Sequence, residues 1–346
     1  MTRKGFPFKP QVAGWELTLA CNMQCLHCGS SAGRPRPDEL AVAEGLDLID
    51  QLADLGARIV TLSGGEPLLH PAWDRYAARL SEKGVETFLI TNGLLLGPSI
   101  PKIVASGMKR IGISIDGAEK THDFIRNRPG SLRAALDAAR DAKAAGLSVG
   151  AVTHVSNANF SELDELHGLL TTVPFDFWQV QLAFRQGRMK EHAGFALDPG
   201  RMEAVALSVH RKQRAKGKPW VVAGDNLGYY CAPPITKYPW KGCHAGRHLV
   251  GIDADGAVKG CLSLPREFVE GNVRKESLKR IWEDPERFKY NRYFSNDMLK
   301  GSCRGCPKGN PCRAGCTVTA VSATGSKFDN PYCLYHLQQA KSEKRN

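Results

Sequence analysis

Strand-like apolar runs and amphipathic helix-like runs alternate six times in the first two thirds of this 346-residue chain. In each unit, a short run of β-branched and aliphatic residues precedes a longer run with helical spacing, and glycine or proline separates the two. The strands are expected near residues 15–19, 58–62, 87–90, 110–115, 148–153 and 177–182. Parallel strands must be joined by crossovers, which such helices provide, so the pattern predicts a parallel α/β sheet.

Six units are too few to close an eight-stranded barrel. We therefore expect a partial (β/α)6 barrel of the TIM type over residues 14–220, although periodicity alone leaves a doubly wound sheet open. Residues 1–13 read as an extended lead-in, and the proline-rich segment 221–242 reads as a bridge. In either architecture, the loops that follow the carboxyl ends of the strands form the site.

The pattern changes after residue 242. Residues 243–336 are dense in cysteine and glycine and poor in apolar residues, so we expect a small α+β unit that depends on metal for its stability. Two short apolar runs around an Asp-Gly turn, 248–252 and 257–262, predict a hairpin, and a helix is expected near 276–284. Residues 337–346 are expected to be a flexible tail.

The charge pattern argues against a nucleic-acid partner. The chain carries 47 basic and 35 acidic residues, a formal net charge of +12, but the basic residues concentrate only at 211–218 and 341–345. A field of this sign could instead attract an acidic peptide or a phosphate-bearing partner. The sequence shows neither a secretory signal nor a membrane span, so we expect a cytoplasmic protein.

Cysteine supplies the first candidate site. Cys21, Cys25 and Cys28 follow the first expected strand with C-x3-C-x2-C spacing. Thiolates at this spacing can converge on iron or zinc, but three ligands are one short of a tetrahedral set. The loop therefore either finds a fourth ligand elsewhere, as a zinc site does, or leaves one iron of a cluster open for a small molecule. Three more loops, 64–67, 91–93 and 114–117, are expected to converge beside it.

These features together resemble the radical S-adenosylmethionine enzymes, in the branch with a SPASM auxiliary-cluster domain. The resemblance extends from Trp15 to Cys333, although His27 stands where that family usually has an aromatic residue. It implies three [4Fe-4S] clusters, one in the barrel at Cys21, Cys25 and Cys28 and two auxiliary, with S-adenosylmethionine as cofactor. The residues it implies for S-adenosylmethionine binding are Gly64, Gly65, Glu66, Pro67, Asn92, Ser114 and Arg126.

By the same resemblance, Glu66 would meet the ammonium group of S-adenosylmethionine, Ser114 its ribose and Arg126 its carboxylate, which a guanidinium can grip with two hydrogen bonds. Asn92 would approach the ligand or cap a turn. A surface salt bridge is the alternative for Arg126.

The carboxyl-terminal cysteines match the SPASM pattern. One auxiliary cluster would use Cys303, Cys306, Cys312 and Cys333. The other would use Cys243, Cys261 and Cys316, with Cys231 either as fourth ligand or as a free thiol beside an open iron. The alternative for the whole set is a pair of zinc sites.

The resemblance implies an enzyme that modifies a carbon of a ribosomally made peptide through a 5′-deoxyadenosyl radical. Formylglycine formation in sulfatases and haem-precursor decarboxylation are alternatives; Leu262 stands where the sulfatase branch usually has an acidic residue. A non-catalytic iron-sulfur or zinc scaffold is the alternative of another class.

The thirteen residues before the first strand leave no room for a fused recognition domain, so we expect either a separate leader-recognition protein as a partner or a leader that docks directly on the enzyme. The resemblance also implies an electron donor of the flavodoxin or ferredoxin type. The sequence identifies no general base. The residues that could face a substrate are Tyr229, Tyr230, His244 and Asp255.

Overall fold

The computed structural model of the protein describes residues 6–224, 226–236 and 240–343. One ten-stranded sheet has the order β10-β9-β8-β1-β2-β3-β4-β5-β6-β7. The strands from β1 to β7 are all parallel to their neighbours. They are β1 (Val12–Thr18), β2 (Ile59–Gly64), β3 (Glu86–Thr91), β4 (Arg110–Ser114), β5 (Ser148–Val155), β6 (Phe177–Leu182) and β7 (Trp220–Ala223). The partial barrel that the alternation predicted is confirmed.

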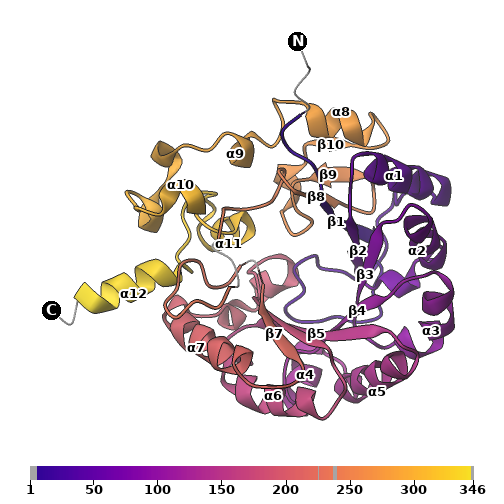
Figure 1. Cartoon of the computed structure of the whole chain (residues 1–346), viewed down its shortest axis with the longest axis horizontal. Coiled ribbons are helices and arrows are strands. Elements are labelled where there is room, and N and C mark those ends of the chain that lie inside the picture. Colours follow the sequence, from indigo (N-terminus) through magenta and orange to yellow (C-terminus); the bar gives the residue numbers. More distant parts are fainter. Residues whose placement is uncertain (1–5, 225, 237–239, 344–346) are drawn as a thin grey trace.

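Helices cover the outer face of this curved sheet (Figure 1). They are α1 (Val42–Asp54), α2 (Trp73–Glu82), α3 (Leu96–Ala105), α4 (Glu119–Arg126), α5 (Ser131–Ala144), α6 (Leu163–Thr171) and α7 (Met202–Gln213). Helix α1, for example, buries the apolar stripe of Leu48, Ile49 and Leu52.

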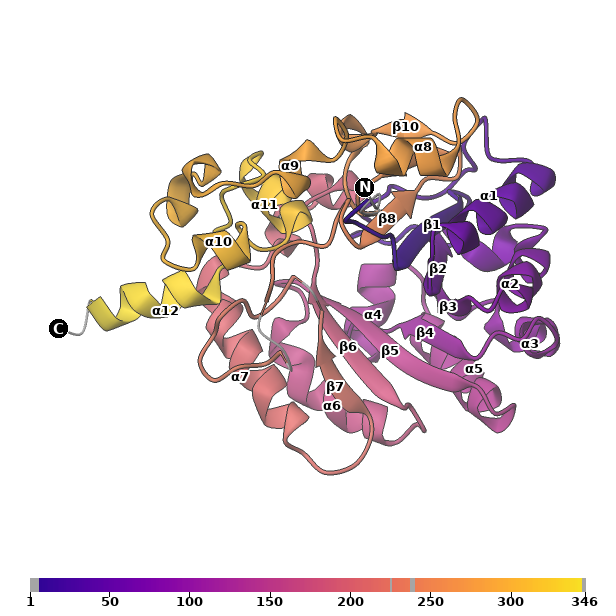
Figure 2. The ribbon, with the colours of Figure 1, turned by 45° about the horizontal axis from the view of Figure 1, so that its top comes forward.

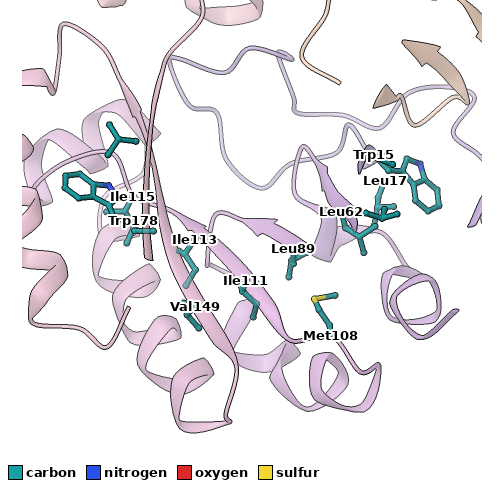
Figure 3. Packing of buried hydrophobic residues seen from close by; sticks show 14 of the residues in the cluster. Trp15, Leu17, Leu62, Leu89, Met108, Ile111, Ile113, Ile115, Val149 and Trp178 are labelled. Carbon is teal, nitrogen blue, oxygen red and sulfur yellow. The ribbon is translucent and has the colours of Figure 1, made fainter. Parts of the chain in front are cut away.

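The main core lies between the strands and these helices. Leu62, Leu89, Ile111 and Val149 come from four neighbouring strands, and all four are fully buried (Figure 3). Alternate residues of each strand face this core, so the other residues face the inside of the barrel.

The barrel differs from the sequence expectation at two places. A seventh strand, β7, pairs with β6 in the segment where we placed the boundary between barrel and bridge. Its four residues are followed by no helix, so alternation could not reveal it. Helix α4 also lies between β4 and α5, where we expected one helix; Asn127 ends it with a left-handed backbone conformation.

The carboxyl-terminal unit extends the barrel sheet. β8 (Leu249–Ile252) pairs in parallel with β1. β9 (Ala257–Lys259) pairs with β8 in the antiparallel direction, which confirms the predicted hairpin. β10 (Gly271–Asn272) completes the sheet. The helices of this unit are α8 (Leu278–Glu283), α9 (Lys289–Arg292), α10 (Gly309–Cys312), α11 (Thr317–Thr324) and α12 (Leu334–Glu343).

This unit extends from the side of the open barrel where α1 lies to the side where α7 lies (Figures 1 and 2). Helix α8 contacts α1, and α12 contacts α7. Residues 337–343, which we expected to begin a flexible tail, belong to α12, where the Gln338 side chain bonds the backbone of Ala232 at both N and O. Residues 344–346 of that tail lie outside the described residues. Within the described ranges, every helix is too short or too polar to cross a lipid bilayer.

Candidate functional site

A cavity of about 520 Å³ opens at the carboxyl ends of the barrel strands. The six strands β1 to β6 each contribute to its wall; the residues are Glu16, Ser63, Ile90, Ser114, His154 and Gln181. The cysteine loop after β1 and residues 262–266 after β9 form further parts of the wall. The cavity therefore lies where the barrel meets the carboxyl-terminal unit.

Cys21, Cys25 and Cys28 all line this cavity. Burial, together with smaller effects of the neighbouring thiols Cys25 and Cys28, raises the pKa of Cys21 to about 11. Burial likewise raises the pKa of Cys25, against the opposing charge of Arg126. Three thiolates on the wall of one cavity are stabilised by a positive group among them, which a metal centre supplies. The donor set fits a soft metal centre.

The cysteine loop is held from the far side of the barrel by Arg188, which lies after β6. Its guanidinium donates to the carbonyl of Cys25 at 3.0 Å and to that of Ala32 at 2.9 Å. The neighbouring Gly187 has φ +51°, and a Cβ there would meet the carbonyl oxygen of Gly29 at 2.4 Å. No local pattern predicts this contact, because the partners are more than 150 residues apart in the sequence.

Gly64 and Gly65 line the cavity, but glycine is required at both positions because of close contacts with the protein's own backbone. A Cβ on Gly64 would meet the carbonyl oxygen of Thr18 at 2.3 Å, and one on Gly65 that of Ala20 at 2.2 Å. Gly64 also has φ +140°. The two glycines let the β2 loop pack on the backbone just before Cys21, so they position the cysteine loop.

Glu66 is fully buried and is absent from the cavity wall. Its carboxylate accepts hydrogen bonds from the Thr91 hydroxyl and the backbone N–H of Asn92, both at 2.9 Å, and from Leu68 N at 3.2 Å. It thereby ties the β3 loop to the β2 loop. Pro67, also buried, begins the short 3-10 helix Pro67–Leu69 and does not line the cavity.

Replacing Glu66 with glutamine is expected to change how stability depends on pH. Burial raises the pKa of Glu66 from 4.5 to about 7, against its hydrogen bonds. Between about pH 4.5 and about pH 7, Glu66 keeps a proton in the native protein that it releases in the unfolded chain. Its contribution therefore lowers the free energy of unfolding as pH rises through this range, by up to about 3 kcal/mol in total. The glutamine variant lacks this contribution.

The measurement is denaturant unfolding of both proteins at about pH 5 and about pH 7. Burial lowers the pKa of His122 and of His154 to about 4, and these groups raise stability as pH rises in both proteins. Only the difference between the two pH slopes therefore reports on Glu66, and equal slopes would contradict the expectation.

Asn92 and Ser114 both line the cavity, at the ends of β3 and β4. The Asn92 side chain donates to Asn22 Oδ1 in the cysteine loop at 2.7 Å, and its oxygen accepts from Leu94 N at 3.0 Å. Asn92 thus caps a turn and also faces the cavity. Ser114 is nearly buried, with 8% of its surface exposed.

Arg126 reaches the cavity from the last residue of α4, and it is no surface residue. Its guanidinium pairs with Asp116 at 2.6 Å, and its Nη1 lies 3.8 Å from the Sγ of Cys25. Asp116 also contacts His27 Nε2 at 3.0 Å and accepts from the backbone N–H of His154 at 2.9 Å. Burial tends to raise the pKa of Asp116, but Arg126 and His27 outweigh it and hold that pKa well below its usual range.

The opposite wall of the cavity comes from the hairpin of the carboxyl-terminal unit. Lys259 pairs with Asp253 at 2.8 Å and also donates to the carbonyls of Leu262 and Leu264. Arg266 pairs with Asp253 and Asp255. We did not identify Lys259 or Asp116 from the sequence; the signal for Asp116 is a carboxylate directly after an apolar strand.

The carboxyl-terminal cysteines fall into two groups. Cys303, Cys306, Cys312 and Cys333 line one pocket together. Cys243, Cys261 and Cys316 belong to or pack against one buried cluster, and the first two thiols add to burial in raising the pKa of Cys316. The resemblance implied these same groups as ligands of two auxiliary clusters, and that role stays a prediction.

Cys231 stands apart from both groups. Its Sγ donates to the carbonyls of Gly228 and Pro233, each at 3.3 Å. It packs in the main core with Leu227 and Ile235, and no other cysteine is among its interactions in the described part of the chain. Of the two roles that the sequence left open, this geometry favours the free thiol.

The residues that could have faced a substrate do not line the barrel cavity. Tyr229 and Tyr230 line the pocket of the four cysteines instead. The hydroxyl of Tyr229 accepts from Cys316 N at 2.9 Å, and Asp255 pairs with Arg266. His244 lies against Trp240 and His248.

Comparisons with known proteins agree with this geometry. The family model of the radical SAM superfamily matches residues 15–170, and that of the SPASM iron-sulfur cluster-binding domain matches residues 243–307. An AdoMet-dependent heme synthase of Methanosarcina barkeri is 30% identical, over 94% of this chain and 97% of the relative. The mycofactocin maturase MftC of Mycobacterium ulcerans is also 30% identical, over 92% and 85%.

Among solved structures, Streptococcus suis SuiB bound to S-adenosylmethionine superposes with a TM-score of 0.74. The match covers 93% of this chain and 76% of SuiB, at 16% sequence identity. At that identity the likeness supports the fold alone.

Proposed function

This chain belongs to the radical S-adenosylmethionine superfamily and carries a SPASM domain, and from this premise we propose that it modifies a ribosomally made peptide. It is an enzyme that uses S-adenosylmethionine and [4Fe-4S] clusters. When bound, these cofactors supply a 5′-deoxyadenosyl radical that removes hydrogen from an unactivated carbon. In the proposed reaction, that carbon belongs to a side chain or the backbone of the peptide, and the result is an oxidative modification or cross-link.

The observation that carries the radical chemistry is the shared cavity of Cys21, Cys25 and Cys28. We propose that these thiolates hold the cluster whose fourth iron binds S-adenosylmethionine. Asn92 and Ser114 offer polar groups to that ligand from the cavity wall. Arg126 keeps a fixed positive charge beside Cys25 because Asp116 balances it within the protein.

Two further roles follow from the packing of the loops. Gly64, Gly65 and Glu66 fix the β2 and β3 loops against the cysteine loop, so in our proposal they shape the ligand site through the backbone. The proposed ligands of the auxiliary clusters are Cys303, Cys306, Cys312 and Cys333 in one, and Cys243, Cys261 and Cys316 in the other.

The peptide substrate is supported by the likeness to MftC, which is named a maturase. Haem-precursor decarboxylation is a second candidate, favoured by the likeness to heme synthases of Methanosarcina barkeri and Nitratidesulfovibrio vulgaris over 94% of the chain. Sulfatase maturation is the third candidate, and Leu262 departs from the pattern of that branch.

A low-potential donor of the flavodoxin or ferredoxin type and a separate leader-recognition protein complete the proposal as partners. The net charge of +12 supports an acidic leader. We also propose a cytoplasmic location, because clustered thiols that hold iron need a reducing compartment.

The test is a comparison of two substrates with anaerobically reconstituted enzyme. Short peptides encoded beside the gene and iron-coproporphyrin III are each incubated with S-adenosylmethionine and a strong reductant, and 5′-deoxyadenosine and product masses are measured. We expect a peptide to gain a modification that requires S-adenosylmethionine. Decarboxylation of the porphyrin with no change in any peptide would establish the second candidate instead.

A further inference from the structure

β7 is the last strand of the sheet on the side away from β1. Two large apolar side chains on one of its faces are exposed: Trp220 at 64% and Val222 at 46%. Their register partners in β6 are Phe177 and Gln179, so they lie on the face opposite to the buried Trp178. An exposed apolar pair on a terminal strand is a feature that proteins commonly cover.

The backbone of β7 leaves one side without a partner. Trp220 N donates to Asp176 O at 3.0 Å, and Gly224 N donates to Val180 O at 2.8 Å. Alternate residues of a strand point their backbone groups in opposite directions, so Val221 and Ala223 direct their N–H and C=O groups away from β6. In the described part of the chain, no strand pairs with that edge.

The segment before β7 is strongly basic. Arg211 in the last turn of α7, and Arg214, Lys216 and Lys218 between α7 and the strand, are all exposed. Two acids contact this segment and both are already paired, Asp176 with Lys143 and Lys218 and Asp164 with Lys212. A partner that extends past the beginning of β7 therefore meets net positive charge, which favours acidic residues there.

The other end of β7 leads to the catalytic cavity. Ala223 is in register with Val180, and the next residue of β6, Gln181, lines the cavity. A strand added beside β7 in parallel would run from the basic segment 211–218 toward the cavity wall. Its residues after the added strand would thus arrive near the cavity.

We propose that the free edge of β7 binds an extended, acidic segment of the peptide substrate as an added parallel strand. The backbone of the peptide pairs with Val221 and Ala223, and its apolar residues pack on Trp220 and Val222. Its acidic residues lie at segment 211–218, and the part to be modified follows into the cavity. This inference rests on the proposed peptide substrate and names where its recognition segment binds.

The probe for this site is a fluorescein-labelled peptide of about ten residues in which glutamate and valine alternate. A lysine-valine peptide of the same length is its control. We expect the reconstituted full-length protein to bind the glutamate probe, more weakly as salt rises, and to bind the control poorly. Hydrogen exchange should show slower exchange of the amides in segment 219–224 when the glutamate probe is present.

Ala223→Pro removes an outward N–H and blocks the edge, while the bond from Gly224 N to Val180 O is kept. We expect this substitution to lower the affinity for the glutamate probe about fivefold to tenfold. Lys216→Glu should weaken the probe about threefold at low salt, and Lys275→Glu, which reverses an exposed charge before α8, should leave binding unchanged. Melting curves of all variants identify any that fail to fold, and Trp220→Ala is the second edge variant if Ala223→Pro fails.

The outcomes separate the two levels of the proposal. Unchanged affinity in Ala223→Pro and Trp220→Ala, or no slowing of exchange in segment 219–224, would overturn the edge site alone. A doubled mass in sedimentation that the edge variants abolish would assign the edge to a second copy of the chain. Turnover of iron-coproporphyrin III without binding of any peptide would overturn the peptide substrate as well.

Discussion

A Cys25→Ala variant is expected to form no 5′-deoxyadenosine above background and to bind about eight irons per chain in place of about twelve. Cys25 lies on the cavity wall with Cys21 and Cys28, and its loss leaves two thiolates for the cluster of the barrel. The auxiliary cysteines lie in the other unit and remain intact. Iron assay after anaerobic reconstitution, and chromatography of the S-adenosylmethionine reaction, measure the two effects.

Cys231→Ala is the matched control, because Cys231 is also buried but interacts with no other cysteine in the described part of the chain. It should keep about twelve irons and continue to cleave S-adenosylmethionine. A loss of iron in this variant would assign Cys231 to a cluster. Full activity of Cys25→Ala, or zinc in place of iron in the wild type, would contradict the radical mechanism and favour the scaffold reading.

Asp116→Ala is expected to lower the free energy of unfolding by about 3–5 kcal/mol near neutral pH. The substitution removes the carboxylate that balances the buried guanidinium of Arg126 and bonds His27 and the backbone of His154. A buried charge that loses its partner keeps its desolvation cost without compensation. Denaturant unfolding of the two proteins at the same pH measures the difference.

The double variant Asp116→Ala with Arg126→Met provides the control. Removing both charges should cost less than removing Asp116 alone, because no charge is then left unpaired. Since the pKa of Asp116 is held below its usual range, its contribution is present above about pH 4 and is lost as pH falls through the native-state pKa. Equal losses in the single and double variants would show that the charge pair is not the cause.

The sequence predicted the parts of this protein that rest on local patterns. The six alternating units and the hairpin at 248–262 rest on spacing within one short segment, whereas the grouping of the auxiliary cysteines came from the family resemblance and stays a prediction. Strand β7 was not predicted, because four residues without a following helix carry no periodic signal. Helix α12 was not predicted, because contacts with α7 and Ala232 stabilise it and its composition alone does not indicate a helix.

The site was predicted as a set of positions but not as a set of contacts. Cys21, Gly64, Asn92, Ser114 and Arg126 do share one cavity, as expected for loops at the same edge of a parallel sheet. What each side chain does there depends on partners far away in the sequence. The buried carboxylate of Glu66 accepts hydrogen bonds from three donors of the β2 and β3 loops. Arg126 pairs with Asp116, and Arg188, which lies after β6, bonds the cysteine loop after β1.

The pairing of β1 with β8 has a consequence for biosynthesis. Val12 is in register with Leu249, and Trp15 with Ile252, so β1 gains its second neighbour only after most of the chain has left the ribosome. At about 5–20 residues per second, β1 waits on the order of ten seconds or more with one edge open. A barrel expressed without the carboxyl-terminal unit keeps that edge exposed permanently, and we expect such a truncation to aggregate.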